Sequence, residues 1–70
     1  MEMIPVSSSD IRAIGYDAAT ATLRVDFISG GIYEYFDVPE SVHANFLRAA
    51  SYGEFLNDFI RYNYRYQRIG

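Results

Sequence analysis

The sequence predicts an α+β fold: a three-stranded antiparallel β-meander, then two short helices and a C-terminal extended segment or fourth strand. Three observations support this prediction. Residues 23–27 alternate between apolar and polar side chains, and a similar run over 32–36 follows the turn Gly30-Gly31. The apolar spacing becomes helical after Pro39. Alternation then returns over residues 61–69, where tyrosines interleave with arginines and an asparagine.

The first strand is expected at residues 11–16, after a loose lead-in over residues 1–10. Pro5 and the run of serines at 7–9 favour extended or turn conformations there. The second strand, residues 23–27, places Leu23, Val25 and Phe27 on one face. The third strand is expected at residues 32–36.

The turn between the second and third strands decides which way Glu34 points. A two-residue turn would place Glu34 on the apolar face, where an unpaired carboxylate costs several kcal/mol. A three-residue loop over 29–31 pairs Phe27 with Tyr33 and leaves Glu34 opposite Asp26, at about 0.2–1 kcal/mol. We therefore expect the longer loop, with Tyr33 and Tyr35 mainly in the core and their hydroxyls at its rim.

The opposite face of the sheet then carries an apolar patch of Ile28, Ile32 and Phe36. Either the C-terminal tail covers this patch or the patch is a contact surface.

Two helices follow the strands. The first is expected from about Pro39 to Ala50, because proline suits a first helical turn and Glu40 complements the helix dipole. Ser51 and Glu54 have the spacing of a capping box, which predicts a second helix with an apolar stripe. Gly53 weakens that helix, so we expect it to be short. The stripe consists of Phe55, Leu56, Phe59 and Ile60.

A chain of 70 residues without cysteine is expected to form one domain, residues 1–70, stabilised by packing alone or by a partner chain. The aromatic fraction of 17% compensates for the small size. The expected aromatic core residues are Phe27, Tyr33, Tyr35, Phe46, Phe55 and Phe59.

The net charge of −3 argues against a generally basic nucleic-acid-binding protein. The charge is uneven, however. Residues 1–60 hold all nine acids and three arginines, a net −6, whereas residues 61–70 hold three arginines and no acid. No apolar run is long enough to span a membrane and no signal peptide is recognisable, so a cytoplasmic location is the default expectation.

These residues together resemble the KTSC domain family over nearly the whole chain, from about Pro5 to Ile69. The matching segments are Pro5-Val6-Ser7-Ser8-Ser9, Ile14-Gly15-Tyr16-Asp17, residues 23–27, Gly31-Ile32-Tyr33-Glu34-Tyr35, Val38-Pro39, Ala49-Ala50-Ser51-Tyr52-Gly53, Asn57 with Ile60-Arg61, and Tyr64-Arg65-Tyr66-Gln67-Arg68-Ile69. The chain departs from the family pattern at Arg65, where proline often stands between the two tail tyrosines. That departure makes the tail less rigid.

The resemblance implies a short bacterial module, found alone or at the C-terminus of some lysyl-tRNA synthetases. The family's function is not established, and that context suggests RNA. It implies no catalytic residue.

The tail is the strongest candidate site, because arginines neutralise phosphates and tyrosine rings stack on bases. The alternative is a structural strand whose arginines pair with the acidic body. The candidate nucleic-acid-binding residues are Arg61, Tyr62, Tyr64, Arg65, Tyr66 and Arg68.

No pattern of an enzyme, a metal site or a cofactor site is present. His43 has no second histidine or cysteine at metal-ligand spacing and is expected to be a solvated helix residue. Pairing it with Ser7, Ser8 or Ser9 as a hydrolase triad lacks any nucleophile motif. We therefore expect a non-enzymatic module that binds RNA or single-stranded nucleic acid, or alternatively a protein-interaction module or homodimer.

Overall fold

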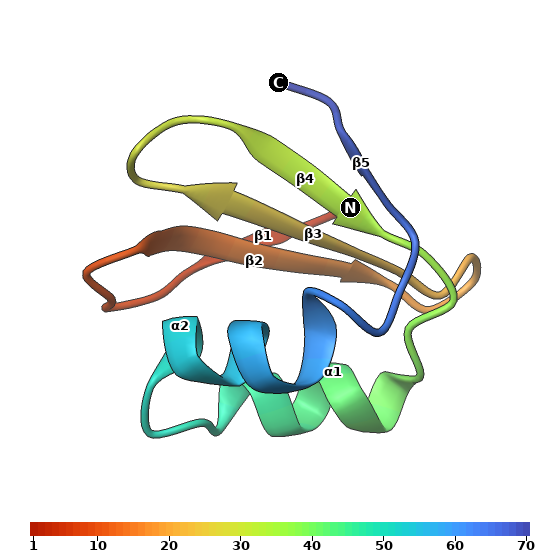
Figure 1. The fold of residues 1–70 in the computed structure, drawn as a ribbon. Helices are drawn as coiled ribbons and strands as arrows, with labels where there is room; N and C mark the ends of the chain where they lie inside the picture. Colours follow the sequence, from red (N-terminus) through yellow and green to blue (C-terminus); the bar gives the residue numbers. More distant parts are fainter.

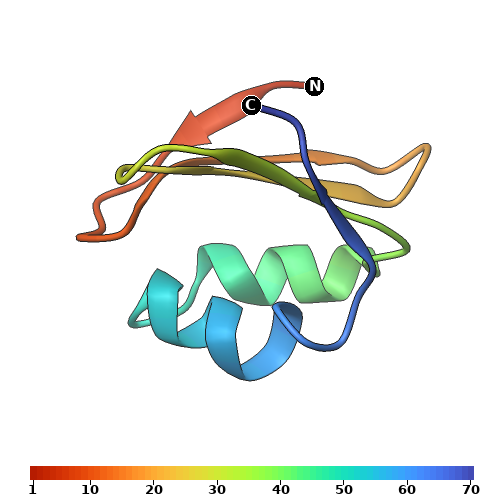
Figure 2. The ribbon, with the colours of Figure 1, turned by 45° about the horizontal axis from the view of Figure 1, so that its top comes forward.

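One face of a five-stranded antiparallel sheet is covered by a layer of helical segments in the computed structural model, which describes all residues 1–70 (Figure 1). The strands lie in sequence order, as β1 (Met3–Pro5), β2 (Ile11–Asp17), β3 (Thr22–Phe27), β4 (Ile32–Tyr35) and β5 (Tyr66–Arg68). The helical layer contains α1 (Glu40–Leu47), α2 (Tyr52–Phe55) and a π-helical turn η1 (Leu56–Ile60) that continues α2. Figure 2 shows the same two layers from a second direction.

The predicted α+β class is confirmed, but the sheet is larger than predicted. A strand forms within residues 1–10, where a loose lead-in was expected, and the tail adds a further strand, as one of the two alternatives proposed. Strand β1 pairs with β2 through Met3 opposite Gly15. A Cβ at Gly15 would overlap the Met3 sulfur, so the missing side chain makes room for β1.

The hairpin between β3 and β4 differs from the predicted register by two residues. Val25 pairs with Tyr33, and Glu34 lies opposite Arg24 instead of Asp26. The connection is longer than expected, because Gly30 and Gly31 both adopt positive φ and the Phe27 N–H donates to the Gly31 carbonyl. Glu34 therefore faces a guanidinium, with Arg24 Nη2 to Glu34 Oε2 at 2.6 Å.

The predicted faces are nevertheless correct, because a shift of two residues preserves the alternation. Tyr35 is buried and Tyr33 is half-buried on the face that the helices cover. The core lies between this face and the helical layer. Its nine buried residues are Ile11, Ile14, Leu23, Val25, Tyr35, Val38, Phe46, Leu56 and Ile60.

The helices begin close to where the sequence predicts. Helix α1 starts after Pro39 and ends at Leu47, before the predicted Ala50. The Ser51 side chain caps α2 by accepting a hydrogen bond from the Glu54 N–H at 3.3 Å, as the capping box predicts. None of the helices has the length and apolarity needed to cross a membrane.

The π-helical turn corrects one predicted core residue. Leu56 and Ile60 are buried, but Phe59 is 55% exposed. The prediction assumed ordinary helical spacing. In η1 the Arg61 N–H instead donates to the Leu56 carbonyl, five residues back, and this wider turn directs Phe59 outward.

The C-terminal tail covers much of the apolar patch on the other face. The backbone of Ile32 exchanges hydrogen bonds with Ile69 and Gly70, and the Arg65 guanidinium lies 5.4 Å from the centre of the Phe36 ring. Ile28 alone among the three patch residues stays largely exposed.

Candidate functional site

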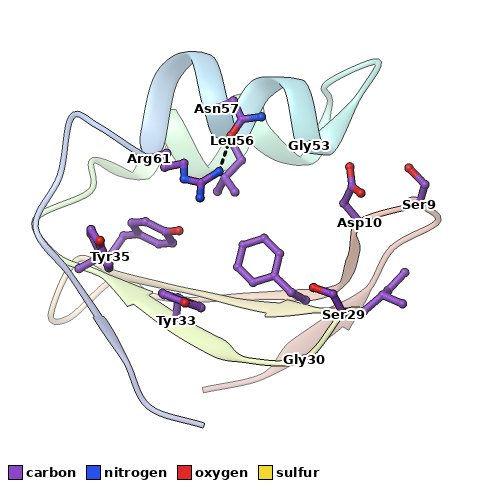
Figure 3. A pocket seen from close by; sticks show the side chains of 13 residues that line it. Ser9, Asp10, Ser29, Gly30, Tyr33, Tyr35, Gly53, Leu56, Asn57 and Arg61 are labelled. Atoms are coloured by element: carbon purple, nitrogen blue, oxygen red, sulfur yellow. Dashed lines mark hydrogen bonds between the residues drawn. The ribbon is translucent and has the colours of Figure 1, made fainter.

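A groove of about 570 Å³ lies between the sheet and the segment formed by α2 and η1 (Figure 3). The sheet and its loops form one wall and the helical segment forms the other. The lining residues are Ser9, Asp10, Phe27, Ile28, Ser29, Gly30, Tyr33, Tyr35, Gly53, Leu56, Asn57, Arg61 and Tyr66.

The floor of the groove is a continuous row of aromatic rings. Phe27 meets Tyr33 edge to face, with ring centres 5.6 Å apart. Tyr66, on the edge strand β5, lies 5.9 Å from Tyr33 and 5.8 Å from Tyr35. The hairpin thus supplies three rings and the tail supplies the fourth, because β5 pairs with β4 and places Tyr66 opposite Tyr35.

The tyrosine hydroxyls of this floor form no hydrogen bond within the protein, unlike that of Tyr16, which donates to the Val38 carbonyl at 2.6 Å. Every buried polar side-chain atom has a partner, so the hydroxyl of the buried Tyr35 opens to the groove. Burial raises the pKa of Tyr35, and the nearby Arg61 guanidinium opposes that effect. The Tyr35 hydroxyl, whose pKa is raised, is therefore neutral at neutral pH.

Two guanidinium groups border the aromatic floor without an acidic partner. The Arg61 Nη1 donates to Asn57 Oδ1 at 3.1 Å, and its side chain projects toward Tyr35 in Figure 3. The Arg68 guanidinium lies 5.9 Å from the Tyr33 ring centre, and its Nε donates to the Gly70 carbonyl. The protein has two ion pairs, Arg24 with Glu34 and Arg65 with Asp37, and neither uses Arg61 or Arg68.

The structure gathers only part of the predicted tail site. Arg61 and Tyr66 line the groove together with Tyr33 and Tyr35, and Arg68 does not line it but lies beside the Tyr33 ring. Arg65 lies over Phe36 and pairs with Asp37 at 3.3 Å. Tyr62 is 82% exposed and does not line the groove.

Tyr64 faces a second hollow. This hollow is lined by Val42, Asn45, Phe55, Phe59, Asn63 and Tyr64. The six candidates therefore do not form one surface, because residues 61–64 are a turn and only residues 66–68 are a strand.

The end of the groove beside the β3–β4 loop is polar and was not predicted. Ser9, Asp10 and Ser29 lie there, and Asn57 lies on the helical wall. Nothing local marks these residues, because they come from segments far apart in the sequence.

His43 is not the solvated residue that the sequence predicts. Its ring stacks on Tyr16, with ring centres 4.5 Å apart and planes 11° apart. Burial lowers the pKa of His43, with Glu40 opposing the effect. No group of three or more histidine, cysteine or acidic side chains is placed to hold a metal ion.

Comparison with known proteins identifies the fold's family. The model of the KTSC domain matches residues 7–64. The chain belongs to the KTSC domain family. A crystal structure of a KTSC domain protein from Yersinia pestis is 40% identical and superimposes with a TM-score of 0.96, over 99% of this chain and 97% of that one.

Its relatives include both small proteins and parts of large ones. An uncharacterised protein of Stutzerimonas stutzeri is 39% identical over 70 residues, covering 99% of each chain. The lysine–tRNA ligase of Nostoc punctiforme is 34% identical over 67 residues, which are 96% of this chain but only 12% of the ligase. The resemblance predicted from the sequence is thus confirmed, and the function of the KTSC domain is not established.

Proposed function

We propose that this KTSC domain is a small non-enzymatic module that binds single-stranded RNA in the groove. The observation that carries the proposal is the row of four aromatic rings bordered by Arg61 and Arg68, which have no acidic partner. Aromatic rings accept bases by stacking, and guanidinium groups bind phosphates.

The groove combines the two chemistries that single-strand binding needs. Stacking on an aromatic ring contributes about 1–3 kcal/mol per base and tolerates any sequence. The net charge of −3 is no obstacle, because Arg61 lines the groove, Arg68 lies beside its Tyr33 ring, and Asp10 is the one acid among the lining residues. The two alternatives for the tail are compatible, since β5 is a structural strand that also brings Tyr66 into the groove and Arg68 beside the Tyr33 ring.

The similarity to lysine–tRNA ligases supports RNA as the ligand. In those proteins a segment similar to this chain occupies 12% of an enzyme that acts on tRNA by its name. A single-strand-binding groove there would be close to an RNA substrate. For this chain the groove geometry is the main support.

The proposal is tested by fluorescence anisotropy with a labelled oligouridine of about eight nucleotides, a length typical of small single-strand-binding folds. Each phosphate contact adds about 0.7 to the slope of log affinity against log salt. Arg61→Gln and Arg68→Gln should each lower that slope by about this amount, because each variant removes one cation at the groove.

The matched control is Arg48→Gln, since Arg48 is exposed at the end of α1 and lines neither hollow. This variant should retain the wild-type slope. Tyr66→Leu should weaken binding at all salt concentrations by the loss of one ring. Absence of binding by the wild-type protein, or equal slopes for all three arginine variants, would contradict the proposal.

A second candidate function is protein interaction or homodimer formation through the other hollow. Its support is Phe59, which is 55% exposed beside Phe55 with ring centres 4.8 Å apart. Analytical ultracentrifugation at high concentration tests the dimer. A species that stays at 8.0 kDa would count against self-association.

A further inference from the structure

The groove has an acidic end opposite its cationic end. Asp10 lies at the β3–β4 loop end, away from Arg61 (Figure 3). The Asp10 backbone is held on both sides: its N–H donates to Ser8 Oγ at 3.1 Å, and its carbonyl accepts from the Ile28 N–H at 2.9 Å. Its carboxylate has no hydrogen bond and no ion pair within the protein. A fixed backbone thus holds a carboxylate that has no hydrogen-bond partner at this end of the groove.

Gly53 makes room for this carboxylate. A Cβ at position 53 would lie 2.7 Å from Asp10 Oδ2, which is closer than real contacts allow. Gly53 has no positive φ, so its helical backbone does not itself require glycine. Glycine inside a helix costs up to about 1 kcal/mol relative to alanine. Glycine at this position therefore lets the Asp10 carboxylate approach the helix closely without moving.

We propose that Asp10 makes the groove select guanine at one position of the bound strand; this inference rests on the proposed RNA-binding function. A carboxylate only accepts hydrogen bonds, and guanine has two neighbouring donors on its Watson–Crick edge, N1–H and the exocyclic amino group. The Ser9 and Ser29 hydroxyls at the same end are suitable donors for guanine O6.

The other bases fit this end less well. Adenine and cytosine have an amino donor beside a ring nitrogen that is an acceptor, and that nitrogen repels a carboxylate oxygen. Uracil has one N–H between two carbonyl acceptors. Guanine is therefore the base whose donors match both Asp10 oxygens.

The aromatic floor gives such a base its orientation. In the view of Figure 3, Tyr33 and Tyr35 lie together at the end of the groove away from Asp10, and Arg61 lies above Tyr35. A base stacked on the floor with its Watson–Crick edge toward Asp10 directs its sugar and phosphate away from the carboxylate. The phosphate is then on the side of the guanidinium groups, so charge and hydrogen bonding favour the same orientation.

The test uses the full chain and oligouridines in which one central base is replaced by guanine, inosine, adenine or cytosine. We expect the guanine oligonucleotide to bind about tenfold tighter than oligouridine, which is the order expected for a bidentate contact to a base. Inosine keeps N1–H but lacks the amino group, so it should bind with intermediate affinity.

The Asp10→Asn variant is expected to change which base the groove prefers, and not only to weaken binding. An amide has one acceptor group and one donor group, which match the ring nitrogen and amino group of adenine or cytosine but cannot accept from both N1–H and the amino group of guanine. The variant should lose its preference for guanine and bind adenine or cytosine oligonucleotides more tightly than the wild type does. The matched control is Asp58→Asn, which makes the same charge change on η1 outside the groove and should retain the guanine preference.

The outcomes separate this inference from the proposed function. Equal wild-type affinities for all oligonucleotides, or an Asp10→Asn variant that keeps the guanine preference, would overturn the guanine inference and leave RNA binding intact. Failure of the wild type to bind any oligonucleotide would overturn both. Overlapping denaturation curves for Asp10→Asn and the wild type would assign the changed preference to recognition and exclude an altered fold.

Discussion

Replacing Gly53 by alanine separates two opposing effects at the junction of groove and helix. Alanine is preferred over glycine inside a helix by about 1 kcal/mol. Against this gain, the new Cβ would lie 2.7 Å from Asp10 Oδ2. The Asp10 side chain is exposed and unpaired, so it can rotate away at a cost of about 0.5–1.5 kcal/mol if it leaves its rotamer. The expected net change in unfolding free energy is therefore between about −0.5 and +0.5 kcal/mol.

Removing the carboxylate should reveal the full helical gain. An Asp10→Ala background removes the carboxyl group that crowds the new Cβ, and the retained Cβ of residue 10 lies at an ordinary contact distance of 3.8 Å. Gly53→Ala should then stabilise the protein by about 1 kcal/mol, or roughly 4–8 °C in melting temperature for a domain of this size. Urea denaturation followed by circular dichroism measures the change in unfolding free energy caused by Gly53→Ala in each background. The difference between these two changes is the interaction energy of the pair.

Two results would refute this reasoning. Equal stabilisation by Gly53→Ala in both backgrounds would mean that the Asp10 carboxylate does not lie against position 53. Destabilisation by more than about 1 kcal/mol in both would mean that glycine is required by the backbone itself.

Two further predictions concern the helical layer. Phe46→Ala should destabilise the protein by about 3–5 kcal/mol, because Phe46 is fully buried against Phe55 and Tyr52; a chain of this size should then be largely unfolded by circular dichroism. The lowered pKa of His43 means that the unfolded state binds its proton more tightly. The unfolding free energy of the wild type should thus fall as pH decreases below about 6.5, and the His43→Gln variant should lack this decrease. Equal pH profiles of unfolding free energy for the wild type and the variant between about pH 5 and 8 would contradict this prediction.

The sequence allowed prediction of the features that depend on neighbouring residues. Alternation placed Leu23, Val25, Tyr33 and Tyr35 on the correct face, because side chains of a strand alternate regardless of exact register. The spacing of Ser51 and Glu54 predicted the start of α2, because a capping box depends only on residues within one helical turn.

The remaining features depend on contacts between distant segments. Strand β1 is only three residues long and ends in proline, so its partner across the sheet decides its conformation. The outward position of Phe59 follows from a π-helical turn that the apolar spacing does not reveal. The acidic end of the groove joins Asp10 to Gly53 and Ser29, three segments that meet only in the folded chain.

The position of β5 at the edge of the sheet has a consequence for dynamics. This strand has three exposed residues and pairs on one side only, yet it carries Tyr66 and Arg68. Short edge strands open locally at a small fraction of the global unfolding free energy. The floor of the groove is therefore expected to lose the Tyr66 ring transiently while the rest of the fold stays intact. A bound ligand that contacts these residues would hold the strand closed, so slower amide hydrogen exchange at residues 66–68 is the expected signature of occupancy.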